Sequence, residues 1–130
     1  MKTANLLSFL LLAGLLLVLT SYRPDTTSID NLEEVPMPEN VKAILDNKCF
    51  GCHNVESKGD KAKEKLLLDK INELSKSKLI ATLSDIEEVA EEGTMPPEKF
   101  LEKYPDKKLS AKEQEILRSW AASTADDLLK

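Results

Sequence analysis

The chain has 130 residues, of which 42% are hydrophobic, 5% aromatic and 32% charged, and its formal net charge at pH 7 is −5. Acidic and basic residues are interspersed and no basic face dominates, which argues against nucleic acid as a partner. This length suits one small domain, whose core is marginal unless something staples or fills it.

An apolar run over residues 6–19 follows Lys2, the only charged residue before it. The run has about the length of the apolar region of a signal peptide and is shorter than the roughly 20 residues that cross a bilayer. Because no Ala-x-Ala cleavage site follows, we expect residues 1–21 to be either a signal peptide or a membrane anchor. Both predict an exported protein, periplasmic or otherwise, which in the second case is tethered to the membrane.

Residues 22–38 are rich in Thr, Ser, Asp and Pro, and they indicate a linker. The domain is then residues 39–130. It is predicted to be an all-α bundle of about four helices, because it lacks alternating β-branched runs and hairpin signals. The first helix is expected over residues 39–48, where Val41, Ile44 and Leu45 form one apolar stripe.

The second helix is predicted from Asp60 to about Lys78, with Leu67, Ile71 and Leu74 on one face. It follows the break at Lys58-Gly59.

Two capping boxes predict the starts of the last two helices. Ser84 with Glu87 is expected to open a short helix that stops at Gly93. Ser110 with Glu113 opens the final helix. Its apolar face is predicted to consist of Ile116, Leu117, Trp120 and Ala121, with Trp120 as a core aromatic.

The stretch Cys49-Phe50-Gly51-Cys52-His53 contains both cysteines and the only histidine of the chain. It has the pattern C-x-x-C-H, which is typical of c-type haem attachment. Two thiols three positions apart on a helical turn can each add to a vinyl group of one porphyrin, and the next residue then directs its imidazole towards the iron. We therefore predict one covalent haem bound through Cys49 and Cys52, with His53 as the proximal iron ligand. The haem would also fill the small core.

Three other uses of the cysteines remain as alternatives. A zinc site needs a fourth ligand, and the chain has no further Cys or His. A thioredoxin-like redox pair normally lies near a βαβ pattern, which this sequence lacks. A plain disulfide is common in exported proteins.

The sixth iron ligand is predicted to be Met95. With one histidine, bis-histidine ligation is excluded within a monomer, and haem iron is commonly held by His and Met in electron carriers. Pro96 and Pro97 fix the backbone beside Met95 and so would aim its side chain. The alternatives are that Met95 fills a gap in the core, or that Met37, which also precedes a proline, is the ligand.

CFGCH, followed by GTMPP and by LSAKEQEILRSWA, resembles the small haem-binding domain family of monohaem c-type cytochromes. The resemblance is best over residues 84–121 and is also good around the cysteines. It implies that Cys49 and Cys52 bind haem, that His53 is the proximal ligand and that Met95 is the distal one. Family members carry a tryptophan segment soon after the haem motif, whereas residues 57–78 here are charged and rich in lysine. The sequence therefore does not predict the pocket wall on that side.

The expected function is electron transfer between larger redox proteins by an exported cytochrome that is not itself an enzyme. The alternative is a haem sensor or a peroxidase-like protein with an open sixth site, which the lack of a second histidine as distal catalyst disfavours. An acidic cluster precedes Met95 and is predicted to lie on the distal side, where it would lower the reduction potential and favour a basic partner. It consists of Asp85, Glu87, Glu88, Glu91 and Glu92.

Overall fold

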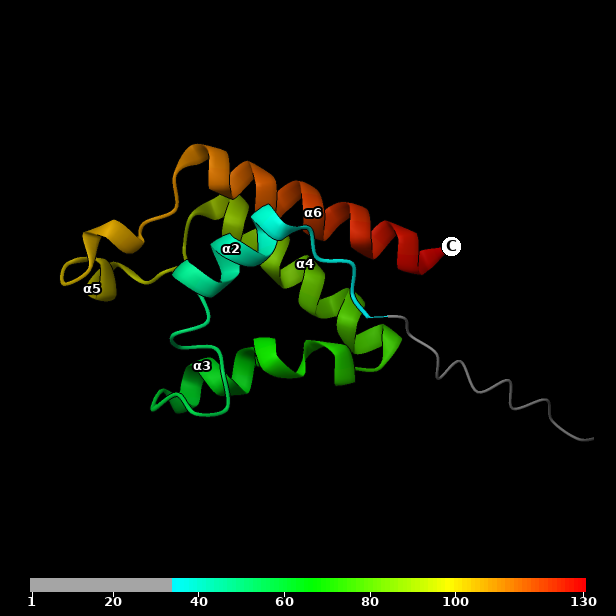
Figure 1. Cartoon of the computed structure of the whole chain (residues 1–130), viewed down its shortest axis with the longest axis horizontal. Helices are drawn as coiled ribbons and strands as arrows, with labels where there is room; N and C mark the ends of the chain where they lie inside the picture. The colour runs from blue at the N-terminus through cyan, green and yellow to red at the C-terminus, as the bar shows by residue number, and fades with distance from the viewer. Residues whose placement is uncertain (1–33) are drawn as a thin grey trace, which may run out of the picture. The chain divides into compact units, whose positions relative to one another are not determined.

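The computed structural model describes residues 34–130, and every regular element in that range is helical. The five α-helices and two short 3₁₀ helices are α2 (Glu39–Lys48), α3 (Asp60–Lys65), η1 (Leu68–Glu73), α4 (Lys76–Glu92), α5 (Glu98–Leu101), η2 (Pro105–Lys107) and α6 (Ala111–Leu129). The predicted all-α fold class is confirmed (Figure 1). The predicted signal peptide or anchor, residues 1–21, lies outside the described residues. Within residues 34–130, no helix has the length and apolar character needed to span a bilayer.

The first and last helices form as the sequence predicts. Helix α2 covers Glu39–Lys48 and buries Val41, Ile44 and Leu45. In α6 the capping box is complete. The Ser110 hydroxyl accepts from the backbone N–H of Glu113, and the Glu113 carboxylate accepts from the N–H of Ser110. Both helices could be predicted because their signals, an apolar stripe and a capping box, lie within the helix itself.

The single helix predicted over residues 60–78 is wrong. Helix α3 ends at Lys65, Leu66 is extended with φ −155° and ψ 132°, and η1 begins at Leu68. The carbonyl of Leu66 and the N–H of Leu68 both bond to His53, at 3.2 Å and 2.9 Å. These tertiary hydrogen bonds outweigh local helix propensity, which is a weak prior.

The capping box predicted at Ser84 is also wrong, because Ser84 lies inside α4. Helix α4 begins at Lys76, and its N-cap is Ser75, whose side chain accepts from the N–H of Lys78 at 3.4 Å. A longer apolar stripe decides the start of the helix. It consists of Leu79, Leu83, Ile86 and Ala90, all buried. The predicted stop is confirmed, since Gly93 adopts the left-handed conformation with φ 65°, which glycine favours.

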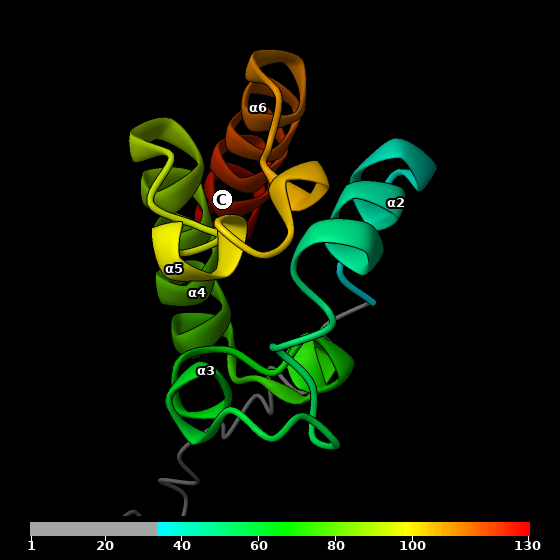
Figure 2. The same cartoon turned by 90° about the vertical axis from the view of Figure 1, so that its left-hand side faces the viewer.

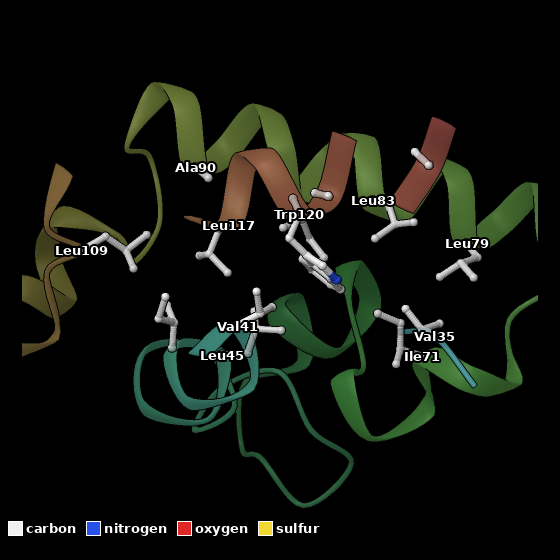
Figure 3. Close-up of a cluster of buried hydrophobic side chains, with 14 residues drawn as sticks. Val35, Val41, Leu45, Ile71, Leu79, Leu83, Ala90, Leu109, Leu117 and Trp120 are labelled. Carbon is white, nitrogen blue, oxygen red and sulfur yellow. The ribbon is translucent and has the colours of Figure 1, made fainter. Parts of the chain in front are cut away.

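The core lies between α4, α6 and α2. Helices α4 and α6 form the most extensive helix pair and lie side by side in both views, and α2 packs on α6 (Figures 1 and 2). Figure 3 shows Leu117 and Trp120 of α6 facing Val41 and Leu45 of α2. The predicted core position of Trp120 is confirmed by its 6% exposure.

Part of the segment expected as a linker, residues 22–38, packs on the domain. Val35 is 5% exposed and belongs to the core cluster, and its N–H donates to Oδ1 of Asn72 at 3.0 Å. The Trp120 indole Nε1 donates to the carbonyl of Pro36 at 2.8 Å. These contacts fix Val35 and Pro36 ahead of α2.

Candidate functional site

The C-x-x-C-H stretch forms a compact turn directly after α2. The N–H of Cys49 continues the helix by donating to the Leu45 carbonyl at 2.9 Å. The N–H groups of Cys52 and His53 then both donate to the Cys49 carbonyl, each at 3.1 Å. The backbone thus folds the motif into one turn, as the sequence predicts.

The ring of His53 is held by two backbone carbonyls. Its Nδ1 lies 3.1 Å from the oxygen of Ala62 and 3.2 Å from that of Leu66. Because carbonyl oxygens only accept hydrogen bonds, Nδ1 must carry the hydrogen, and in the neutral ring Nε2 then keeps its lone pair. Metal-binding histidines are typically oriented in this way by a partner on the other nitrogen. The geometry therefore makes Nε2 of His53 a suitable iron ligand.

Both cysteines are free thiols, so the disulfide alternative is not realised in this structure. Burial raises the pKa of the Cys49 thiol to about 11, and the neighbouring Cys52 adds to the effect. A thioredoxin-like pair instead needs a lowered pKa. Cys52 itself is exposed. Among the described residues, no three His, Cys, Asp or Glu side chains gather into a metal-binding group.

One cleft of about 310 Å³ brings together three of the four predicted site residues, Cys49, His53 and Met95. Cys52 is not among its lining residues. Met95 is 37% exposed, so its side chain lies at the edge of the cleft and not in the core as a gap filler. The complete lining is Leu45, Cys49, His53, Lys65, Leu66, Thr82, Asp85, Ile86, Glu88, Val89, Ala90, Met95, Leu109 and Leu117.

Met37, the other candidate sulfur ligand of the domain, lies elsewhere. It packs partly against the core and lines a different cavity of about 550 Å³, together with Val35, Phe50 and Asn72. Neither Cys49 nor His53 lines that second cavity. Of the two methionines in the described residues, Met95 is therefore the one that shares a cleft with the histidine.

The acidic cluster divides between two faces of α4. Asp85 and Glu88, which are three positions apart, line the cleft beside Met95. Among the described residues that line the cleft, Lys65 is the only basic one. The prediction that acidic groups lie beside Met95 therefore holds for these two carboxylates.

Glu87 and Glu91 face Arg118 on α6. The pKa of the Arg118 guanidinium is raised, chiefly by hydrogen bonds to Glu115 and in smaller part by the charges of Glu91 and Glu87. Arg118 pairs chiefly with Glu115, so its charge compensates Glu87 and Glu91 only in small part, but neither of these two carboxylates lines the cleft. They therefore contribute less to the potential of the cleft than Asp85 and Glu88 do.

Two apolar lining residues are not among those that the sequence singles out. The charged pattern of residues 57–78 did not predict which residue forms the wall on that side. The structure shows that Leu66 lines the cleft from the extended break after α3. Leu109 is 7% exposed and directly precedes Ser110, the N-cap of α6. An apolar residue before an N-cap commonly packs on its own helix, so Leu109 carried a recognisable signal.

The donor groups and walls of this cleft fit an iron porphyrin. Its walls are largely aliphatic, with Leu45, Ile86 and Leu117 among them, and both the imidazole of His53 and the thioether of Met95 line it. A volume of about 310 Å³ lies at the lower end of the roughly 300–1,000 Å³ usual for cofactor sites.

Comparison with known proteins agrees with this fit. The sequence model of one protein family, described as a haem-binding domain, matches residues 54–123, which is more than half of the chain. The match begins directly after His53, so it covers α3 to most of α6 and leaves out the cysteine motif. No curated protein and no solved structure matches this chain.

Proposed function

Because this chain belongs to the haem-binding domain family and is therefore a haem protein, we propose that it is an exported monohaem c-type cytochrome that transfers single electrons. The observation that carries the proposal is that Cys49, His53 and Met95 line one aliphatic cleft. The apolar run over residues 6–19 supports export, either as a signal peptide or as a membrane tether.

The two cysteines would hold the cofactor covalently. Each thiol adds across one vinyl double bond, with the sulfur bonding to one carbon and the hydrogen to the other, so that nothing is released and no oxidant is needed. The pKa of Cys49, raised to about 11 by burial, keeps that group a thiol at neutral pH. A covalent link suits an exported carrier because its cofactor cannot be lost by dissociation.

His53 and Met95 would be the two protein ligands of the iron. The bonds from Nδ1 to Ala62 and Leu66 keep the imidazole in one orientation, and Met95 lies in the loop after Gly93. When bound, haem supplies a reversible one-electron ferric/ferrous couple, and a thioether ligand raises its potential. If both residues bind the iron, no site on it stays open to a substrate, so we expect no enzymatic activity.

The wild-type protein, produced in a host with cytochrome c maturation, tests this function. We expect haem that survives acid–acetone extraction, a low-spin ferric spectrum with a thioether charge-transfer band, and a reversible one-electron titration. A high-spin ferric spectrum together with ready carbon monoxide binding would instead support the sensor or peroxidase-like alternative. Extractable haem would contradict the covalent attachment.

Acidic residues at the cleft are expected to lower the reduction potential by stabilising the ferric form. The double variant Asp85→Asn/Glu88→Gln should raise the midpoint potential, by on the order of 20 mV for each charge removed at about 10 Å in water. The matched control is Glu87→Gln/Glu91→Gln, for which we expect a smaller shift because neither residue lines the cleft. Potentiometric titration at low salt makes the comparison, and high salt should shrink both shifts. Equal shifts in the two variants, or none at low salt, would contradict the assignment.

The same two carboxylates suggest the kind of redox partner. They are exposed at the edge of the cleft that contains Met95, where a partner would have to approach. Complementary charge steers association and fixes orientation more than it adds affinity. We therefore propose a redox protein with a basic docking face.

A further inference from the structure

Lys48, the last residue of α2, is tied to the segment that precedes α6. Its Nζ donates to the carbonyl of Asp106 at 2.6 Å and to that of Lys108 at 3.3 Å. It also lies 4.0 Å from Oε1 of Glu113. The Lys48 side chain is only 9% exposed, although lysine is almost never buried without partners.

A second lysine, Lys107, joins the same two segments, but its ammonium group comes from the segment that precedes α6 and bonds to the end of α2. Nζ of Lys107 donates to the carbonyl of Asn47 at 3.1 Å and to its Oδ1 at 2.6 Å. Residues 47–48 and 106–108 are thus joined by two ammonium groups that point in opposite senses. They are about 60 positions apart in the chain.

Each of these two short segments lies in a part of the chain that carries a proposed iron ligand. Lys48 directly precedes Cys49, the first residue of the haem motif. Residues 106–108 close the loop that leaves α4 at Gly93, carries Met95 and returns to α6 at Ser110. We define this loop, residues 94–109, as the distal loop.

The bonds of Lys48 and Lys107 lie near the C-terminal end of the distal loop, and the middle of the loop buries little. Helix α5 has four residues, none of them buried, and η2 has three. The rings of Phe100 and Tyr104 stack within the loop at 4.8 Å, but Tyr104 is 50% exposed. Pro96 and Leu109 are the buried residues near its two ends.

We infer that Lys48, assisted by Lys107, is a positioning residue that holds the distal loop against the haem-attachment turn and so keeps Met95 at the iron. The inference rests on the proposed His/Met ligation. A thioether–iron bond would compete with opening of the loop, and the bonds of Lys48 to two loop carbonyls oppose that opening directly. Removing the ammonium would release the loop from the turn that carries Cys49 and His53.

The test compares three variants of the haem-loaded protein. Lys48→Met should raise the affinity of the ferric protein for added imidazole about tenfold, the equivalent of roughly 1.4 kcal/mol, because opening no longer breaks a hydrogen bond to a charged group. Amide hydrogen exchange over residues 94–109 should quicken by a similar factor. Lys48→Arg should return both the imidazole affinity and the exchange rate most of the way to their wild-type values.

Lys42→Met is the matched control. Lys42 is also on α2, but it is exposed, and its one ion pair within residues 34–130 is with Asp46 four residues further along the same helix. It should leave imidazole affinity and loop exchange unchanged. If Lys48→Met does not fold, Lys107→Met, which cuts the bonds to Asn47, is expected to move both readouts in the same direction.

The outcomes separate this inference from the proposed function. A wild-type protein that is low-spin with a thioether band, combined with lysine variants that match Lys42→Met in both readouts, would overturn the positioning role alone. A lower thermal stability with unchanged imidazole affinity and loop exchange would likewise leave Lys48 a purely structural residue. A high-spin wild-type protein would overturn the His/Met ligation, and the inference with it.

Discussion

Replacing Cys49 and Cys52 together by serine is expected to give a protein whose haem passes entirely into acid acetone, whereas the wild-type haem stays with the polypeptide. Serine keeps the size of the side chain but cannot form the thioether. His53 and Met95 remain, so some haem is expected to bind without a covalent link. Extraction followed by quantification of haem in both phases measures the difference.

The single variants sharpen this prediction because the two thiols differ in their surroundings. Cys49 lines the cleft, whereas Cys52 is exposed and does not. If both are attached, each single serine variant should retain one covalent link and show the same displacement of the pyridine haemochrome band from the wild-type position. A Cys52→Ser spectrum identical to that of the wild type would mean that only Cys49 forms a thioether.

Met95→Ala is expected to remove the thioether band and to convert the ferric protein to a high-spin form that binds added imidazole and carbon monoxide readily. The midpoint potential should fall, because a thioether favours ferrous over ferric iron. For a one-electron couple, each tenfold difference in ligand affinity between the two oxidation states shifts the potential by about 59 mV. Absorption spectroscopy and potentiometric titration measure the two effects.

Met37→Ala is the control for this substitution. Met37 lies before α2 and lines a cavity that does not include His53, so its removal should leave the spectrum and potential as they are. The reverse result, with the band lost in Met37→Ala and kept in Met95→Ala, would mean that Met37 reaches the iron.

Helices with self-contained signals could be predicted from the sequence. The stripe of Val41, Ile44 and Leu45 indicated α2, and the capping box of Ser110 and Glu113 indicated where α6 begins. Gly93 ended α4 where expected, because its left-handed conformation is one that other residues avoid. Each of these signals acts within a few residues.

Predictions failed where distant residues determine the backbone. The helix expected over residues 60–78 breaks because Leu66 and Leu68 bond to His53. The cap expected at Ser84 does not form, since the buried stripe of α4 extends to Leu79 on its N-terminal side. In the segment expected as a linker, Val35 packs in the core. The polar residues around it in the chain gave no sign of this.

For the site, the sequence alone determined which donor groups are present. It supplied one imidazole, two thiols in the C-x-x-C-H pattern and a thioether beside two prolines, and these predicted haem as the cofactor. The tertiary structure decided that Met95 and not Met37 shares the cleft of His53, that only Asp85 and Glu88 of the acidic cluster line it, and that Lys48 ties the distal loop to the haem motif. The physical reason is that residue types fix which bonds an atom can make, whereas the choice of partners some 60 positions away depends on how the helices pack.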